Sequence, residues 1–277
     1  MTTDTGPALA RIRVGPGFVS HGTDTPVSAS SLEAGVWEAL RTVRDPELDT
    51  DVVSLDFVAS VEVDQDASTA GWIAHVRLRL PTYFCAPNFA FLMVADAWDS
   101  VSQVDGLADV DVALLDHFAA DAVNAGVAAR AGFVGSMAGT EVGEAVAELD
   151  ELRRRFTERA VMAGTDQVVR PLLAAGHTVE TIAAMSVGDA AEHAAGHRGT
   201  APEMADDLRR LRDRRRELSL PAGDDAPLVL DPSGAAVGID AMPLHLRKAR
   251  SHQVGVDANT SICRGQLAVR YGAARPI

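Results

Sequence analysis

The strongest constraint on the fold is an abrupt change of hydrophobic period in the first half of the chain. Residues 32–43 place apolar side chains at helical spacing, whereas Trp72–Leu80 alternates apolar and polar side chains with a period of two. A helical pattern returns at 87–101. Two more alternating stretches, 58–64 and 110–114, give the order helix, strand, strand, helix, strand. This order predicts a small α/β (α+β) domain.

Composition and hydrophobic periodicity divide the 277-residue chain into four parts. Residues 1–30 are rich in Thr, Ser, Gly and Pro without a sustained period, which indicates a mobile N-terminal arm. Residues 31–135 hold the α/β domain. Residues 136–224 follow the helical period, so we expect a mainly helical region there. Residues 225–277 are expected to form a short, partly β C-terminal tail.

Local signals set the ends of these elements. Ser30 or Ser31 can cap the first helix, and Asp45-Pro46 should end it, because the residue before proline avoids the α region. In the tail, the segments Pro227–Leu230 and Gln266–Arg270 have strand-like patterns.

Charge limits the class of partner. The chain has 39 acidic and 25 basic side chains, a formal net charge of −14 that argues against nucleic acid and membrane surfaces as partners. Residues 30–135 hold 17 acidic and 5 basic side chains, and residues 225–277 hold 4 and 6. The tail could therefore dock on the acidic domain of its own chain or of a partner; the alternative is a solvated tail.

Neither a membrane span nor a signal peptide is expected. No apolar run approaches 18 residues, and the first residues lack the basic start and apolar stretch of a leader. Two cysteines in a chain of this length are not a disulfide framework. We therefore expect a cytoplasmic, reducing location.

The most informative local feature is a cysteine between the second strand and the second helix. Pro87 suits the first turn of a helix, which places Cys85 at or just before the helix N-terminus. There the helix dipole and free N–H groups would lower the pKa of the thiol and favour the thiolate, the form that binds soft metals. The alternative is a buried structural cysteine.

Three motifs in this part of the chain resemble those of a known family. They are Asp45-Pro46-Glu47 after the first helix, the segment Leu55–Val58, and Thr82 followed by Cys85 and Pro87. In this order and spacing they resemble the iron–sulfur cluster assembly (metal–sulfur cluster biosynthetic) domain family.

The resemblance covers about residues 32–130 and leaves a C-terminal extension outside it. It implies a small α/β fold and a role in the assembly of metal centres. Cys85 maps to the family's candidate metal or cluster ligand, and Asp45 and Glu47 map to its acidic motif. Asp56 and Ala86 depart from the family pattern. The alternative for the acidic motif is a structural role, in which it ends the helix and forms a turn.

The cysteine count restricts the cargo that such a site could hold. A cluster held by four thiolates needs four cysteines, and this chain has only Cys85 and Cys263. A homodimer could share one cluster between two protomers. Otherwise the site would use Asp, Glu or His ligands, or would bind iron or an iron–sulfur cluster transiently. Cys263 could also be a small packing residue.

Two other patterns carry a chemical interpretation beside a structural one. His193 and His197 have the i,i+4 spacing with which two imidazoles on one helix face can bind a metal; the alternative is a solvated pair. Arg209–Arg216 holds six arginines among acidic neighbours, which indicates either a solvated helix face or a docking patch for an acidic partner.

These observations lead to three hypotheses of function. The first is an accessory protein without catalytic activity that helps to deliver iron or an iron–sulfur cluster to a client metalloenzyme, such as a multicomponent iron oxygenase. The second is a metal-free chaperone or binding module that stabilises a partner oxygenase subunit. The third is an enzyme in which Cys85 is the nucleophile and His75 the base.

Overall fold

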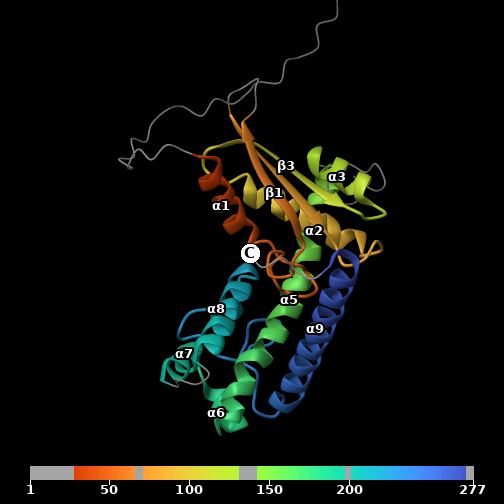
Figure 1. The fold of residues 1–277 in the computed structure, drawn as a ribbon. Helices are drawn as coiled ribbons and strands as arrows, with labels where there is room; N and C mark the ends of the chain where they lie inside the picture. Colours follow the sequence, from red (N-terminus) through yellow and green to blue (C-terminus); the bar gives the residue numbers. More distant parts are fainter. Residues whose placement is uncertain (1–27, 66–70, 131–141, 197–200, 273–277) are drawn as a thin grey trace, which may run out of the picture.

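The structure is a computed structural model that describes residues 28–65, 71–130, 142–196 and 201–272 (Figure 1). An α/β domain forms one end of the molecule, and a group of long helices extends from it. All but the last three residues of the expected N-terminal arm lie outside the described residues. Among the described residues, no helix has both the length and the hydropathy needed to cross a membrane.

The first helix, α1 (Ala29–Leu40), begins earlier than the sequence predicts. The Ser28 hydroxyl accepts a hydrogen bond of 3.2 Å from the Ser31 backbone N–H, and the Ser31 hydroxyl accepts one of 3.1 Å from the Ser28 N–H. This reciprocal capping box satisfies two backbone donors at once. The expected caps at Ser30 or Ser31 are therefore wrong, because Ser31 is already in the first turn.

The end of α1 is also earlier than predicted. The helix stops at Leu40, before Asp45-Pro46, and its last carbonyls are satisfied by the N–H groups that follow it. Arg44 then forms an isolated bridge with Asp51, which requires extended backbone. This pairing separates the proline motif from the helix.

The domain contains a mixed three-stranded sheet in the order β1 (Val58–Gln65), β2 (Trp72–Arg79) and β3 (Leu107–Leu115). Strands β1 and β2 are antiparallel, and β2 and β3 are parallel. Helix α2 (Pro87–Val101) makes the crossover that a parallel pair requires, and α3 (Ala120–Ala128) follows β3. The predicted α-β-β-α-β order and the start of α2 at Pro87 are confirmed.

The alternation along β2 separates the two faces of the sheet as expected. Ala74, Val76 and Leu78 are buried in the main core, where α1 and α2 cover them. The intervening side chains are half-buried and polar or charged. His75 and Arg77 both bind Asp111 on β3, at 3.2 and 2.6 Å.

The rest of the described chain is mainly helical, which confirms the prediction for the described part of residues 136–224 and extends the helical region into the expected tail. Its helices are α5 (Val142–Ala174), α6 (Val179–Ala184), α7 (Val187–Gly196), α8 (Ala201–Glu217) and α9 (Met242–Tyr271). Helix α5 packs along both α8 and α9 (Figure 1). Pro227 and Leu230 form isolated β-bridges, which agrees with the strand-like pattern there.

The expectation of a partly β tail is wrong for Gln266–Arg270, which lies inside the 30-residue helix α9. The apolar alternation of Leu267 and Val269 is too short to distinguish the two structures. Leu267 is 3% exposed and packs on the core, whereas Val269 is 89% exposed.

The buried face of α9 follows a heptad-like spacing of four and three residues, which is typical of packed helices. Its buried members are Met242, Ala249, Gln253 and Leu267, and its half-buried members are Leu246, Val256, Thr260, Cys263 and Arg270.

The long helices share the hydrophobic core of the α/β domain. Phe156 of α5 and Leu267 of α9 are both buried in the cluster that holds the sheet and α2. The rings of Phe156 and Phe89 meet edge to face, with 4.9 Å between their centroids. The C-terminal extension is therefore packed into the domain and positions residues beside it.

Candidate functional site

The candidate site begins at the loop from β2 to α2, which holds Cys85. The Cys85 backbone carbonyl lies 2.8 Å from His117 Nε2. His117 Nδ1 lies 3.2 Å from the Ala119 backbone nitrogen, which can only donate. Nε2 is thus the nitrogen that carries the proton and donates to Cys85. His117 is 5% exposed and connects the Cys85 loop to the segment after β3.

Sequence reasoning did not identify His117. A signal was available, because His117 lies two residues after the end of β3, the parallel neighbour of β2. The carboxyl ends of parallel strands lie at the same edge of a sheet. The loops after β2 and β3 therefore meet.

The other family-motif residues on this loop are placed as follows. Thr82 is half-buried near the end of β2, and Pro87 is the first residue of α2. Ala86 is the N-cap residue and makes no side-chain cap bond.

The acidic motif forms a turn. One oxygen of the Asp45 carboxyl accepts hydrogen bonds of 2.9 Å from the Glu47 N–H and 2.8 Å from the Leu48 N–H. Asp45 is 6% exposed, and burial raises its pKa to about 6 although the two N–H groups act in the opposite direction. Pro46 lies between the two acidic residues and stiffens this turn.

Helix α9 brings the second cysteine to this turn. Asn259 Nδ2 donates a hydrogen bond of 3.1 Å to the Glu47 carboxylate, and Cys263 lies one helical turn further along. Cys85 and Cys263 pack against the same hydrophobic core, and each thiol is close enough to Asp45 and Glu47 for their charges to raise its pKa. Residues from the family domain and from the extension thus share one site.

The electrostatics of Cys85 are the reverse of the sequence-based expectation. Burial, reinforced by the charge of Asp45, raises the pKa of the Cys85 thiol to about 11. The Ala86 N–H acts in the opposite direction, as the helix-start argument predicts, but it is outweighed. The prediction of a lowered pKa for Cys85 is wrong, because a desolvated thiol beside carboxylates keeps its proton.

The two thiols and the two carboxylates of this site do not form a preformed metal-binding site. Within the described part of the chain, no set of three or more His, Cys, Asp and Glu side chains has the arrangement to hold a metal ion. Cys85 and Cys263 are the side chains here with soft-metal chemistry, and Asp45 and Glu47 supply negative charge.

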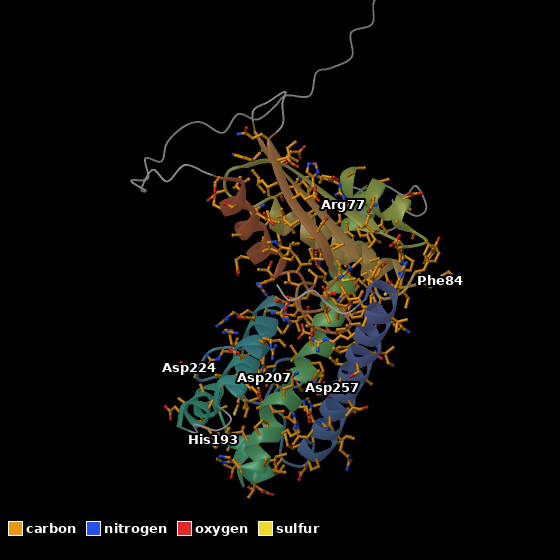
Figure 2. All side chains as sticks on the ribbon, in the orientation of Figure 1. Arg77, Phe84, His193, Asp207, Asp224 and Asp257 are labelled. Atoms are coloured by element: carbon orange, nitrogen blue, oxygen red, sulfur yellow. The ribbon has the colours of Figure 1, made fainter. Side chains whose placement is uncertain are left out.

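The predicted pair of His193 and His197 is only partly described, and the described contact of His193 is with another histidine. His197 lies outside the described residues. His193 Nδ1 lies 3.2 Å from Nε2 of His177, which follows the C-terminal end of α5. Figure 2 shows His193 at the end of the helical region remote from the sheet.

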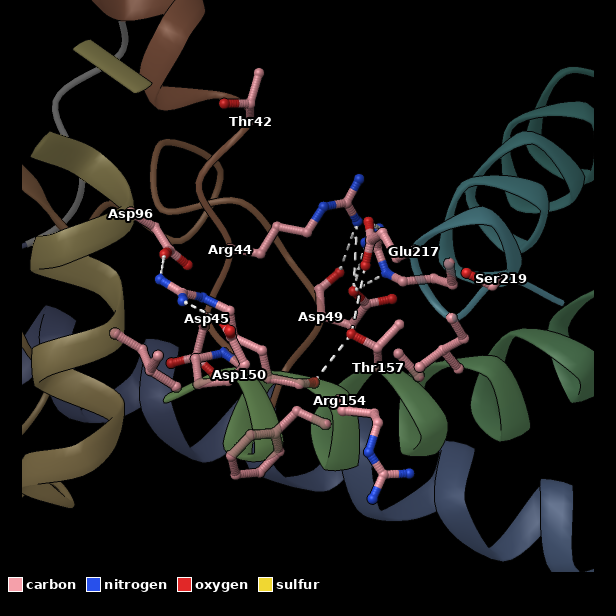
Figure 3. A pocket seen from close by; sticks show the side chains of 17 residues that line it. Thr42, Arg44, Asp45, Asp49, Asp96, Asp150, Arg154, Thr157, Glu217 and Ser219 are labelled. Carbon is pink, nitrogen blue, oxygen red and sulfur yellow. Dashed lines mark hydrogen bonds and ion pairs between the residues drawn. The ribbon is translucent and has the colours of Figure 1, made fainter. Parts of the chain in front are cut away.

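A charged cavity of about 670 Å³ adjoins the acidic turn, between the α/β domain and helices α5 and α8 (Figure 3). Asp45 lies on its wall. Arg214 of α8, whose side chain is 5% exposed, binds the Asp49 carboxylate at 2.5 and 2.7 Å. Arg153 of α5 binds Asp96 of α2. These two ion pairs join helices α8 and α5 to the domain across the cavity.

An exposed aromatic patch flanks Cys85. Tyr83, Phe84 and Phe118 are 48%, 78% and 49% exposed, and their rings contact one another with centroids 5.0 to 6.3 Å apart. Figure 2 shows Phe84 projecting at the outer edge of the domain. Large aromatic side chains that are clustered and exposed are typical of interaction surfaces.

Comparison with known proteins agrees with the motifs. Residues 33–114 match the model of the family described as iron-sulfur cluster assembly protein. This segment is an iron–sulfur cluster assembly domain, and a longer C-terminal region follows it. The resemblance predicted from the sequence is confirmed.

One similar solved structure is the solution structure of a Mycobacterium tuberculosis protein described as associated with Fe-S complex assembly and repair. It is 27% identical, the match covers 36% of this chain and 79% of that one, and the TM-score is 0.24. No curated protein matches the chain.

Proposed function

We propose that this protein is an accessory protein that aids the delivery of iron or an iron–sulfur cluster to a client metalloenzyme, with multicomponent iron oxygenases as the client class. One observation carries the proposal: Cys85 and Cys263 share a half-buried acidic site at the motif of an iron–sulfur cluster assembly domain. Cys263 comes from the extension, so the extension takes part in handling the cargo.

The acidic surroundings suit a divalent cargo. The charges of Asp45 and Glu47 hold protons on the thiols and attract cations by the same Coulomb interaction. Iron must displace those protons to bind the thiolates. The empty protein therefore keeps its thiols protonated and unreactive, and cargo replaces the protons.

Two thiols per chain favour transient binding. A four-thiolate cluster would need the cysteines of two chains, so a homodimer is one way to complete the site. A monomer would leave coordination positions open for ligands of the client. An open site can pass its cargo to a client that offers more ligands.

The test is anaerobic reconstitution with ferrous iron and sulfide, followed by measurement of bound iron, labile sulfide and visible absorption. We expect iron to bind wild type in a fixed ratio and to be lost in Cys85→Ser and in Cys263→Ser. Ser261→Ala is a matched control, because Ser261 is exposed on the same helix and its hydroxyl donates to the Asp257 carbonyl of that helix.

The outcomes separate the alternatives. Iron without sulfide identifies a mononuclear or di-iron cargo, and sulfide in equal amount identifies a cluster. Iron retained in both serine variants contradicts the assigned site. Wild type that binds no iron contradicts the delivery function.

The aromatic patch supports a second candidate, a metal-free chaperone that stabilises a partner oxygenase subunit. Tyr83, Phe84 and Phe118 offer the exposed apolar contacts that a docking surface needs. Phe84→Ser should then weaken co-purification with the client, while Cys85→Ser leaves it unchanged. The delivery function predicts that Cys85→Ser also prevents activation of the client.

Enzymatic catalysis is not part of the proposal. A nucleophilic cysteine needs an accessible thiolate, and burial raises the pKa of Cys85. His75, the base suggested by the sequence, bonds Asp111 at 3.2 Å on the sheet.

A further inference from the structure

The helical region contains a histidine pair remote from the cysteine site. His177 follows α5 after a turn at Gly176, whose φ of +94° is in the left-handed region that favours glycine. His193 lies in the last turn of α7. The two rings are 4.8 Å apart at their centroids, with an angle of 74° between their planes.

The facing nitrogens have the separation of two ligands on one metal ion. His177 Nε2 and His193 Nδ1 are 3.2 Å apart. With metal–nitrogen bonds of about 2.1 Å, two neighbouring positions of a tetrahedral or octahedral ion lie about 3.0–3.4 Å apart. Both side chains are half-buried, so the rings are held by the fold yet open to solvent on one side.

A hydrogen bond between the rings is the alternative explanation of this contact. It requires one of the two facing nitrogens to carry a proton. Metal binding requires both facing nitrogens to be unprotonated, with the protons on His177 Nδ1 and His193 Nε2. The two explanations therefore differ in the position of one ring proton.

We propose that His177 and His193 form a bidentate site for a divalent transition-metal ion of the zinc and nickel type, which imidazole ligands favour. Water completes the coordination. The ion connects the turn after α5 to α7, two segments that otherwise meet through the helical core. The site is independent of Cys85 and Cys263 and of the proposed delivery function.

The test uses Ni²⁺ with the full chain, because the paramagnetic ion broadens the NMR signals of nearby imidazoles and so reports its own position. We expect the ring signals of His177 and His193 to broaden first. Isothermal titration calorimetry should show binding that weakens at least tenfold in His177→Ala and equally in His193→Ala. His252→Ala, an exposed histidine of α9, should bind like wild type.

Several results would overturn the proposal. Binding that depends on His193 but survives in His177→Ala would show that the pair is not the site. An affinity that falls in Cys85→Ser instead would place the ion at the thiols. Unbroadened ring signals at saturating Ni²⁺ would leave the hydrogen bond as the full explanation. Circular dichroism of each variant checks that it is folded.

Discussion

Asn259 on α9 donates a hydrogen bond of 3.1 Å to the carboxylate of Glu47, which lies 212 residues earlier in the chain. This bond joins the extension to the acidic motif of the iron–sulfur cluster assembly domain. Beside it, Cys263 reaches the surroundings of Cys85. The extension therefore contributes to the candidate site as well as to the surface around it.

Arg270 should hold the C-terminal end of α9 on the domain. Its guanidinium donates to the Leu80 carbonyl at 3.2 Å and the Asp116 carbonyl at 2.6 Å. We expect Arg270→Ala to lower the free energy of unfolding by about 1–2 kcal/mol, as measured by urea denaturation. Arg264→Ala is the control, because Arg264 is exposed and forms no ion pair with a described residue. Equal stability of the two variants would contradict the docking role.

Phe156 should couple the long helices to the sheet domain. It is 8% exposed and packs against Phe89. Phe156→Ala should lower the free energy of unfolding by about 3–4 kcal/mol, because it leaves a cavity in the shared core. Phe84→Ala, which removes an exposed ring, should change stability by less than about 0.5 kcal/mol. Thermal unfolding of both variants measures the difference, and a small effect at Phe156 would indicate that the two parts fold separately.

Stability should fall as the pH rises from about 4 to about 6, through Asp45. Burial raises the pKa of Asp45 from 3.8 to about 6. In this window the folded chain keeps a proton that the unfolded chain releases, so folding loses free energy as the pH rises. Asp45→Asn keeps an oxygen for the two N–H groups but cannot ionise. It should flatten this slope by the share of Asp45 and gain at most about 3 kcal/mol at pH 7. The share of Asp49 should remain, because burial raises the pKa of that carboxyl to about 6 as well.

The measurement is urea denaturation of wild type and Asp45→Asn at several pH values between 4 and 7. Glu38→Gln is the control, since its carboxylate is on the exposed side of α1. A slope as steep in Asp45→Asn as in wild type, or one that flattens in Glu38→Gln, would contradict the assignment to Asp45.

Asp45 should also control the ionisation of Cys85. Its negative charge is one of the causes that raise the pKa of the thiol to about 11. Asp45→Asn should therefore lower that pKa and increase the rate of alkylation of Cys85 by iodoacetamide at pH 8. Peptide mapping separates Cys85 from Cys263. An alkylation rate equal to that of wild type would show that the charge of Asp45 does not raise the pKa of Cys85.

His117 should fix the conformation of the Cys85 loop. His117→Ala removes both the bond to the Cys85 carbonyl and the acceptor for the Ala119 N–H, at a cost of about 1–3 kcal/mol. We also expect faster hydrogen exchange in the loop after β2. His252→Ala, at an exposed position, should leave both unchanged. Unaltered exchange in His117→Ala would mean that other contacts hold the loop.

Local periodicity was sufficient for the elements of the domain. The two-residue alternation at β2 and the proline at the start of α2 depend on nearest neighbours, so their prediction needed no tertiary information. The same reasoning failed at Gln266–Arg270, because five residues are too few to separate the two periods. It also misplaced the start of α1, where three serines compete for the cap.

The sequence by itself determined the order of the elements, the family motifs and the two residues with thiol chemistry. Only the tertiary structure decided that Cys263 joins Cys85, that His177 meets His193, and that the pKa of Cys85 rises rather than falls. The physical reason is range. Backbone propensities and the helix dipole act within a few residues, whereas burial and charge depend on which distant groups the fold packs together.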